Sequence, residues 1–215
     1  MAPSNSSVVY ALTQIGGVKS VDGGQTWTKL NLPGPTHIQP NPMYLSIAVH
    51  PTNSGIVWVG ALSLSYTVLR STDGGATWRS ALSCSVNYGP ARIVVDRRAP
   101  TYLYAACTGN EGLQQSTDGG VTWHHAPSPV GTVTSVVVDP NNSQRLYVGT
   151  YSGSNISGVY RSYDRGATWQ RIVAGMSTTW THALAITPTS SMLHAGTTGY
   201  GLGGVGGGVF SRPLT

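Results

Sequence analysis

Seven carboxylates are the first side chains to consider, because acids are common catalytic groups. Cleavage of a glycosidic bond, for example, needs two carboxylates about 5 to 9.5 Å apart on either side of the bond. Six of the seven lie in or next to predicted turns, and Glu111 alone lies in a loop that could face a ligand. The sequence therefore predicts no catalytic carboxylate pair. The seven are Asp22, Asp73, Asp96, Glu111, Asp118, Asp139 and Asp164.

Rings and polar groups between the predicted strands suit a different chemistry, the binding of a carbohydrate or another flat polar ligand. An aromatic face stacks against a ligand while neighbouring amide, imidazole and hydroxyl groups form hydrogen bonds. The alternative for any one ring is that it only caps the interior of the fold. The candidate ligand-binding residues are Tyr44, Tyr66, Tyr88, Asn110, Tyr151, Asn155, Trp180, His182 and Tyr200.

Two cysteines, Cys84 and Cys107, could form a disulfide or remain as two buried thiols. A disulfide between them would add about 3 kcal/mol of stability in the chain-entropy model. No Cys and His spacing matches a zinc site, and no glycine-rich phosphate loop or nucleophile turn is present. We therefore expect neither a metal nor a cofactor.

The turns that hold four of the aspartates are copies of one motif. The copies are "SVDGGQTW" (20–27), "STDGGATW" (71–78), "STDGGVTW" (116–123) and "SYDRGATW" (162–169), so that Asp22, Asp73, Asp118 and Asp164 are 51, 45 and 46 residues apart. A spacing of about 45 residues is typical of a β-propeller blade. Glycine favours positive φ, and the Asp and Thr side chains can hydrogen bond within the turn. We expect a structural role for these turns and a core position for their tryptophans, which are Trp27, Trp78, Trp123 and Trp169.

Short apolar runs between the turns predict strands, because they are four to six residues long, rich in β-branched or aromatic residues, and closed by Pro, Gly, Asn or Asp. Each repeat would contain four antiparallel strands, A to D, with the repeated turn between C and D. The strand A runs are almost continuously apolar, as expected of an innermost strand that is sandwiched between neighbouring blades. The second strand would bury Trp58, Tyr104 and Tyr147.

The first repeat lacks strand A and the last lacks strand D, which predicts an all-β propeller of five blades with incomplete terminal blades in a single domain, residues 1–215. The segment "APSNSS" could supply an outer strand to the last blade. Alternatively, the chain is a piece of a larger ring, or copies exchange unpaired terminal strands and form a homo-oligomer.

The repeated turns resemble the Asp-box, or BNR, repeat of sialidases, the sortilin luminal domain, xyloglucan-cleaving glycosidases, photosystem II assembly factors and propeller lectins. The resemblance covers nearly the whole chain and implies a propeller whose boxes lie opposite the ligand face. That face would carry the D-to-A and B-to-C loops, in which the candidate ligand-binding residues lie. The segment "YALTQIGGVKS" is similar to one where xyloglucan-cleaving glycosidases place a catalytic aspartate, but Gln14 stands there.

Composition excludes several classes of partner. The net charge is +5, but only 9% of residues are charged and they are scattered, so no nucleic-acid surface is expected. The sequence contains no run of about 18 apolar residues, so no membrane-spanning helix is predicted. A surface rich in Ser, Thr and Gly favours an extracellular protein, secreted with a signal peptide that is absent from this chain.

These observations predict a lectin-like binding module that is not an enzyme and whose ligand is a glycan or a protein. The alternatives are a fragment of a larger Asp-box glycoside hydrolase, of the xyloglucanase or sialidase type, and a structural or assembly scaffold.

Overall fold

The fold was analysed in a computed structural model of the 215-residue chain. The structure describes residues 1–13, 16–33, 43–62, 68–84, 92–107, 111–129, 132–151, 156–176, 180–187, 189, 191–198 and 207–214.

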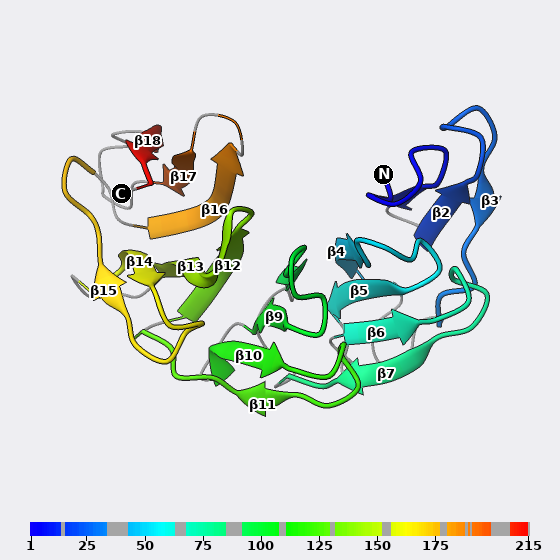
Figure 1. Ribbon diagram of the computed structural model, residues 1–215, viewed down its shortest axis with the longest axis horizontal. Coiled ribbons are helices and arrows are strands. Elements are labelled where there is room, and N and C mark those ends of the chain that lie inside the picture. Colours follow the sequence, from blue (N-terminus) through cyan, green and yellow to red (C-terminus); the bar gives the residue numbers. More distant parts are fainter. Residues whose placement is uncertain are drawn as a thin grey trace. The chain divides into compact units, whose positions relative to one another are not determined.

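The strands form five antiparallel sheets that follow one another along the chain (Figure 1). In the first, β1 (Val9–Thr13), β2 (Gly16–Ser20) and β3 (Thr28–Lys29) lie in that order. The second is ordered β4 (Met43–Val49), β5 (Val57–Leu62), β6 (Val68–Ser71) and β7 (Arg79–Leu82). The third contains β8 (Arg92–Val95), β9 (Leu103–Ala106), β10 (Leu113–Ser116) and β11 (His124–His125).

The last two sheets repeat this order. The fourth contains β12 (Thr132–Asp139), β13 (Asn142–Tyr151), β14 (Gly158–Ser162) and β15 (Gln170–Arg171). The fifth contains β16 (Trp180–Thr187), β17 (Met192–Thr198) and β18 (Val209–Pro213). The prediction of four-stranded antiparallel sheets is confirmed for the second, third and fourth sheets, and the described residues contribute three strands each to the first and the last. Among the described residues, no helix has the length and apolar character needed to cross a membrane.

The described chain divides into two compact units, residues 1–105 with 115–124 and residues 106–114 with 125–215. The first two sheets belong to the first unit and the last two to the second, while the third sheet is divided between them. The single propeller domain stays a prediction.

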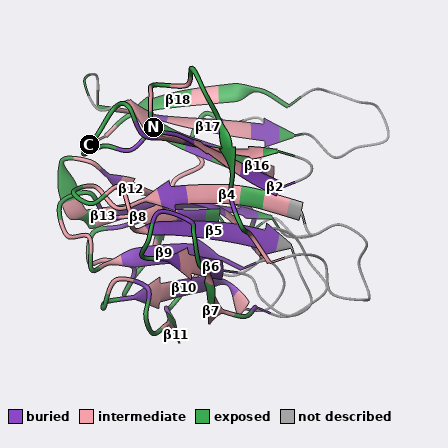
Figure 2. Ribbon diagram, turned by 90° about the vertical axis from the view of Figure 1, so that its right-hand side faces the viewer, coloured by how far each residue is buried: buried purple, intermediate pink, exposed green. Residues whose placement is uncertain are grey.

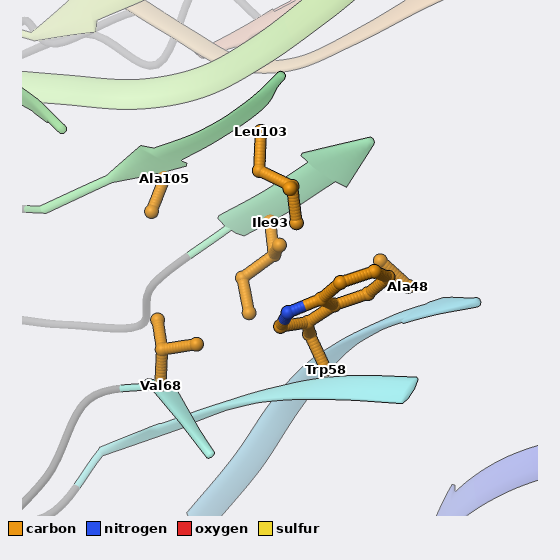
Figure 3. Packing of buried hydrophobic residues seen from close by; sticks show 6 residues of the cluster. All are labelled: Ala48, Trp58, Val68, Ile93, Leu103 and Ala105. Carbon is orange, nitrogen blue, oxygen red and sulfur yellow. The ribbon is translucent and has the colours of Figure 1, made fainter. Parts of the chain in front are cut away.

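A hydrophobic cluster around Trp58 joins the second sheet to the third within the first unit. The Trp58 ring is fully buried and lies against Ile93 and Leu103, with Ala48, Val68 and Ala105 around it (Figure 3). Trp58, Tyr104 and Tyr147 are each at most 1% exposed, so their predicted core positions are confirmed. In the second unit, Tyr147 packs in a separate cluster with Val159, Leu184, Leu193 and Ala195.

In the second, third and fourth sheets the second strand is more continuously buried than the first, whereas strand A was expected to be the innermost strand, sandwiched between neighbouring blades. All four residues of β9 are buried, whereas β8 is buried only at Ile93 (Figure 2). The reason is the strand order, because β4, β8, β12 and β16 are each at the edge of a sheet and the second strand has a partner on both sides.

The N-terminal segment folds on itself. The backbone N–H of Ala2 donates to Val8 O (2.8 Å) and that of Val8 donates to Asn5 O (3.0 Å). Ala2 is buried in the first unit with Val8 and Tyr10. The expectation that "APSNSS" forms an outer strand of the last blade is therefore wrong.

Candidate functional site

The four Asp boxes use their carboxylates inside the turn. In the third box, Ser116 Oγ and Thr122 Oγ1 donate to the two oxygens of Asp118 (2.8 and 2.5 Å), and the Thr122 backbone N–H also donates to it (3.0 Å). The backbone N–H of Gly120 donates to the buried Ser116 Oγ (2.8 Å). The same Ser, Asp and Thr contacts recur in the other three boxes.

Hydrogen bonds explain the acidity of these groups. Bonds from the box threonine, followed by those from serine and the backbone, lower the pKa of Asp164 to about 2. The box threonine likewise gives the largest contribution in lowering the pKa of Asp22, Asp73 and Asp118 still further. Hydrogen bonding to the charged form favours ionisation, so these aspartates are poor proton donors.

Two further aspartates close the turns between the first and second strands. The buried Asp96 accepts from the backbone N–H groups of Arg98 and Ala99 (2.9 and 3.2 Å). Asp139 accepts from the Asn141 backbone N–H (2.8 Å) and from the Arg145 guanidinium (3.3 Å). Of the seven carboxylates, all in the described part of the chain, only Glu111 lies outside such a turn.

Box tryptophans lie nearer the surface than expected. Trp27 is 45% exposed, and Trp78, Trp123 and Trp169 are half-buried. Trp27 and Trp78 donate their Nε1–H to a glycine carbonyl of the same box (3.0 and 3.1 Å), and Trp169 donates to Pro127 O (2.8 Å). This corrects the prediction of a fully buried core position. Trp78 and Trp123 pack against hydrophobic clusters but stay half-buried, and the Nε1–H groups of Trp27 and Trp78 bond to their own turns.

In the second and third sheets, the boxes and the turns between the first two strands lie at the same end. The backbone N–H groups of Gly74 and Gly119 donate to Gly55 O and Thr101 O in those turns (2.8 and 2.9 Å). The opposite sheet ends, here called the open ends, are where the first strand begins and the second ends. The fourth sheet shows this arrangement, since Thr132 pairs with Tyr151 at its open end.

Five of the nine predicted ligand-binding residues lie outside the described residues. They are Tyr66, Tyr88, Asn110, Asn155 and Tyr200. Gln14 lies outside them as well.

Tyr44 has a structural contact. Its hydroxyl donates to Pro33 O (2.5 Å), and its half-buried ring packs beside Val59, Ala61 and Leu69. These contacts fit the alternative in which a ring only covers the interior.

The remaining three candidates come together in the second unit, where they form an aromatic site of Tyr151, Trp180, His182 and Thr198. The Tyr151 and Trp180 rings meet edge to face with centroids 4.6 Å apart and planes at 75°. Trp180 pairs in register with Thr198, whose hydroxyl is 2.8 Å from His182 Nε2. Tyr151 is 39% exposed, and His182 is also exposed. The site thus offers aromatic faces beside an imidazole and a hydroxyl group.

A β-bulge that sequence analysis missed positions His182. The pairing of β16 with β17 is irregular between Thr181 and Ala183, and β12 and β4 show the same irregularity between Val133 and Ser135 and between Tyr44 and Ser46. A bulge inserts one residue and turns its side chain away from the regular alternation. No residue type marks the position, which is occupied by Leu45, Thr134 and His182.

Both cysteines, Cys84 and Cys107, are disulfide-bonded in the structure. Neither is then a thiolate that could bind a metal. The bond stays a prediction for the protein made in an oxidising compartment, where the mass of alkylated, unreduced protein should show no added alkyl group.

The comparisons with known proteins point to glycoside hydrolases. No family model matches the chain. A xyloglucanase of Paenibacillus sp. is 28% identical over an aligned length of 207 residues, and the match covers 79% of this chain and 20% of that protein. This chain thus spans about a fifth of the length of that curated relative.

Solved structures share the fold. The GH74 enzyme of Niastella koreensis has a TM-score of 0.78 at 22% identity, covering 98% of this chain and 35% of that one. The GH74 xyloglucanase of Xanthomonas campestris has a TM-score of 0.75 at 18% identity, with the same coverage. With the sheets described above, this likeness supports the β-propeller fold.

The expectation that the protein is not an enzyme is contradicted, since the curated relative is a xyloglucanase and the similar structures are GH74 enzymes. The inference from the small number of carboxylates failed because a chain that spans a fifth of the length of its relative need not contain both catalytic acids.

Proposed function

We propose that this chain is part of a glycoside hydrolase of the xyloglucanase type and that its aromatic site binds the glucan main chain. The observation that carries the proposal is the edge-to-face pair of the exposed Tyr151 and the half-buried Trp180, with His182 and Thr198 beside it. The xyloglucanase relative supports the choice of polysaccharide.

The chemistry of the site suits a β-linked glucan. Pyranose rings present apolar C–H faces that stack on aromatic rings, while their hydroxyl groups need hydrogen-bond partners at the rim. His182 and Thr198 supply both a donor and an acceptor, and the position of the proton on His182 decides which is which. A bound main chain would lie across the end of the fourth and fifth sheets.

Hydrolysis itself needs two acids. Glu111 is the one carboxylate of this chain that lies outside the boxes and the turns between the first two strands, so the proposed hydrolase would need at least one further acid from outside residues 1–215. A polymeric substrate cannot cross a membrane, which is why we also propose that the protein acts outside the cell.

Affinity electrophoresis tests the proposal. The 215-residue chain should migrate more slowly in native gels that contain xyloglucan than in gels without polysaccharide. Trp180→Ala and Tyr151→Ala should each weaken this retardation about three- to tenfold, the loss expected for one stacking ring.

Tyr163→Ala is the matched control. Tyr163 is 46% exposed but belongs to the fourth Asp box, at the other end of its sheet. Its removal should leave the retardation unchanged. Equal retardation of wild type, Trp180→Ala and Tyr151→Ala, or no retardation by xyloglucan, would refute the proposal.

A further inference from the structure

The second unit contains an apolar cavity whose walls include none of the residues of the aromatic site. It has a volume of about 130 Å³ and lies between the fourth and fifth sheets. Its walls include Val159, Ile172, Leu193, Ala195, Phe210 and Arg212. We call it the seam cavity.

The internal repeat identifies the equivalent place in the first unit. Leu30 and Ile172 each stand three residues after the box tryptophan, Trp27 or Trp169. Strand pairing aligns the other walls, because Val57 pairs with Ser71 as Leu193 pairs with Arg212. In the same way Val59 pairs with Leu69, and Ala195 pairs with Phe210.

In the first unit a tryptophan fills that place. Trp78, which directly precedes the fourth strand of the second sheet, packs against the cluster that contains Leu30 and Val57 and against the cluster that contains Val59 and Leu69. The fifth sheet has no box and no fourth strand among the described residues, and Arg212 stands where the box serine would be. The seam cavity is therefore the space that an indole ring occupies in the equivalent seam.

The outer edge of the fifth sheet, formed by β18, could pair with a further strand. β18 pairs with β17 on one side, and no described strand pairs with its other side. Val209 on β18 is 75% exposed. An edge strand with unpaired backbone groups can accept another strand by β-augmentation.

Cationic side chains of this chain form hydrogen bonds with the boxes of neighbouring sheets. Lys19 Nζ and Arg70 Nε each donate to the first glycine carbonyl of the next box, Gly74 O (3.2 Å) and Gly119 O (3.1 Å). Arg161 holds the same place in β14, where it lies over the Tyr163 ring (4.5 Å) and donates to Gln170 Oε1 (3.0 Å). Arg212 lies in the cavity wall, so two arginines, Arg161 on β14 and Arg212 on β18, stand on strands of the two sheets that form the seam.

We infer that the seam cavity is a docking site for a tryptophan-bearing β-strand of the Asp-box type, supplied by polypeptide outside residues 1–215. The strand pairs with β18, its indole ring enters the seam cavity, and the Arg161 side chain turns to the glycine carbonyl of its box. This site is independent of the glucan proposal, because the two use different residues.

A peptide from the chain itself provides the probe. Fluorescein-labelled peptide with the sequence of residues 71–82, STDGGATWRSAL, is titrated with the intact 215-residue chain and followed by fluorescence anisotropy. We expect saturable binding, and at least tenfold weaker binding of the same peptide with Trp78→Ala. Equal binding of the two peptides would overturn the proposal, whatever the protein variants do.

Two protein variants locate the site. Ala195→Phe fills the cavity and should abolish peptide binding, whereas Ala185→Phe adds the same ring at an exposed position of the same sheet and should not. Retained binding by a folded Ala195→Phe chain would place the peptide elsewhere and contradict the proposal.

Sedimentation equilibrium distinguishes a second copy as the occupant. We expect a monomer in the absence of peptide. Self-association that Ala195→Phe abolishes would overturn the proposal in favour of an exchange between copies.

Discussion

The two ends of each sheet use their polar side chains in opposite ways. At the box end, Ser, Asp and Thr repeat four times with nearly the same hydrogen-bond lengths, and all of these bonds are internal. At the open end the equivalent positions differ from sheet to sheet, and the fourth and fifth sheets carry an exposed aromatic site. The repeated residues of the box ends therefore stabilise the fold, whereas the varied residues of the open ends form the surface available for a ligand.

The largest expected effect tests how closely a box packs against its neighbouring sheet. A Cβ at Gly120 would lie 2.4 Å from Trp58 Nε1, whereas a Cβ at Gly119 would meet no atom within 4 Å. Both glycines have positive φ, 75° and 77°. We expect Gly120→Ala to lower the free energy of unfolding by about 3 kcal/mol or more and Gly119→Ala by about 1 to 2 kcal/mol, measured by urea denaturation.

Since the backbone cost is shared by the two variants, their difference isolates the packing of Trp58. If both variants lost similar free energy of unfolding, the third box would not pack tightly against Trp58 of the second sheet.

A smaller effect tests the hydrogen bonds within a box. Ser116 is fully buried and accepts from the Gly120 N–H while donating to Asp118. Ser116→Ala should lower the free energy of unfolding by about 1 to 2 kcal/mol, because a buried donor loses its acceptor. Ser80→Ala, an exposed serine on β7, is the control and should change it by less than about 0.5 kcal/mol. Glucan binding by Ser116→Ala should equal that of wild type. If binding fell together with stability, the box ends and the open ends would not have separate roles.

Acid should weaken the boxes gradually. The folded pKa of each box aspartate is lowered, to about 2 for Asp164, while an unfolded aspartate titrates near 4. Each carboxylate therefore contributes stability that is fully present above about pH 4 and is lost as the pH falls through the folded pKa. We expect a melting temperature with little box-dependent change between pH 7 and 5 that declines below pH 4.

Asp118→Asn removes one of the four titrating groups and should flatten this decline. An unchanged acid slope in Asp118→Asn would show that the box hydrogen bonds do not set it.

The strand order and the boxes could be read from the sequence because both rest on local rules. Gly-Gly, Asp and Thr define a turn within eight residues, and the period reveals the incomplete first and last sheets. Burial was harder to predict, since the depth of Trp27 depends on what packs over the box from another segment. The bulge at His182 leaves no sequence signal, because the equivalent residues are Leu45 and Thr134.

The aromatic site was partly predictable. Tyr151, Trp180 and His182 were expected to bind a ligand because they lie between predicted strands, and the structure brings them together. Tyr44 met the same criterion but donates its hydroxyl to Pro33 O, a contact that the sequence does not reveal. Enzyme class was predicted wrongly because it depends on acids that this chain need not contain.

Titration of the ¹⁵N-labelled indole groups with a xyloglucan oligosaccharide tests the account most directly. Four of the six tryptophans belong to boxes, Trp58 is core, and Trp180 alone lies at an open end. The Trp180 signal, assigned by its loss in Trp180→Phe, should shift saturably while those of Trp27 and Trp169 stay in place. A shift confined to the box tryptophans, or no shift at a saturating concentration, would contradict the assignment of glucan binding to the open ends.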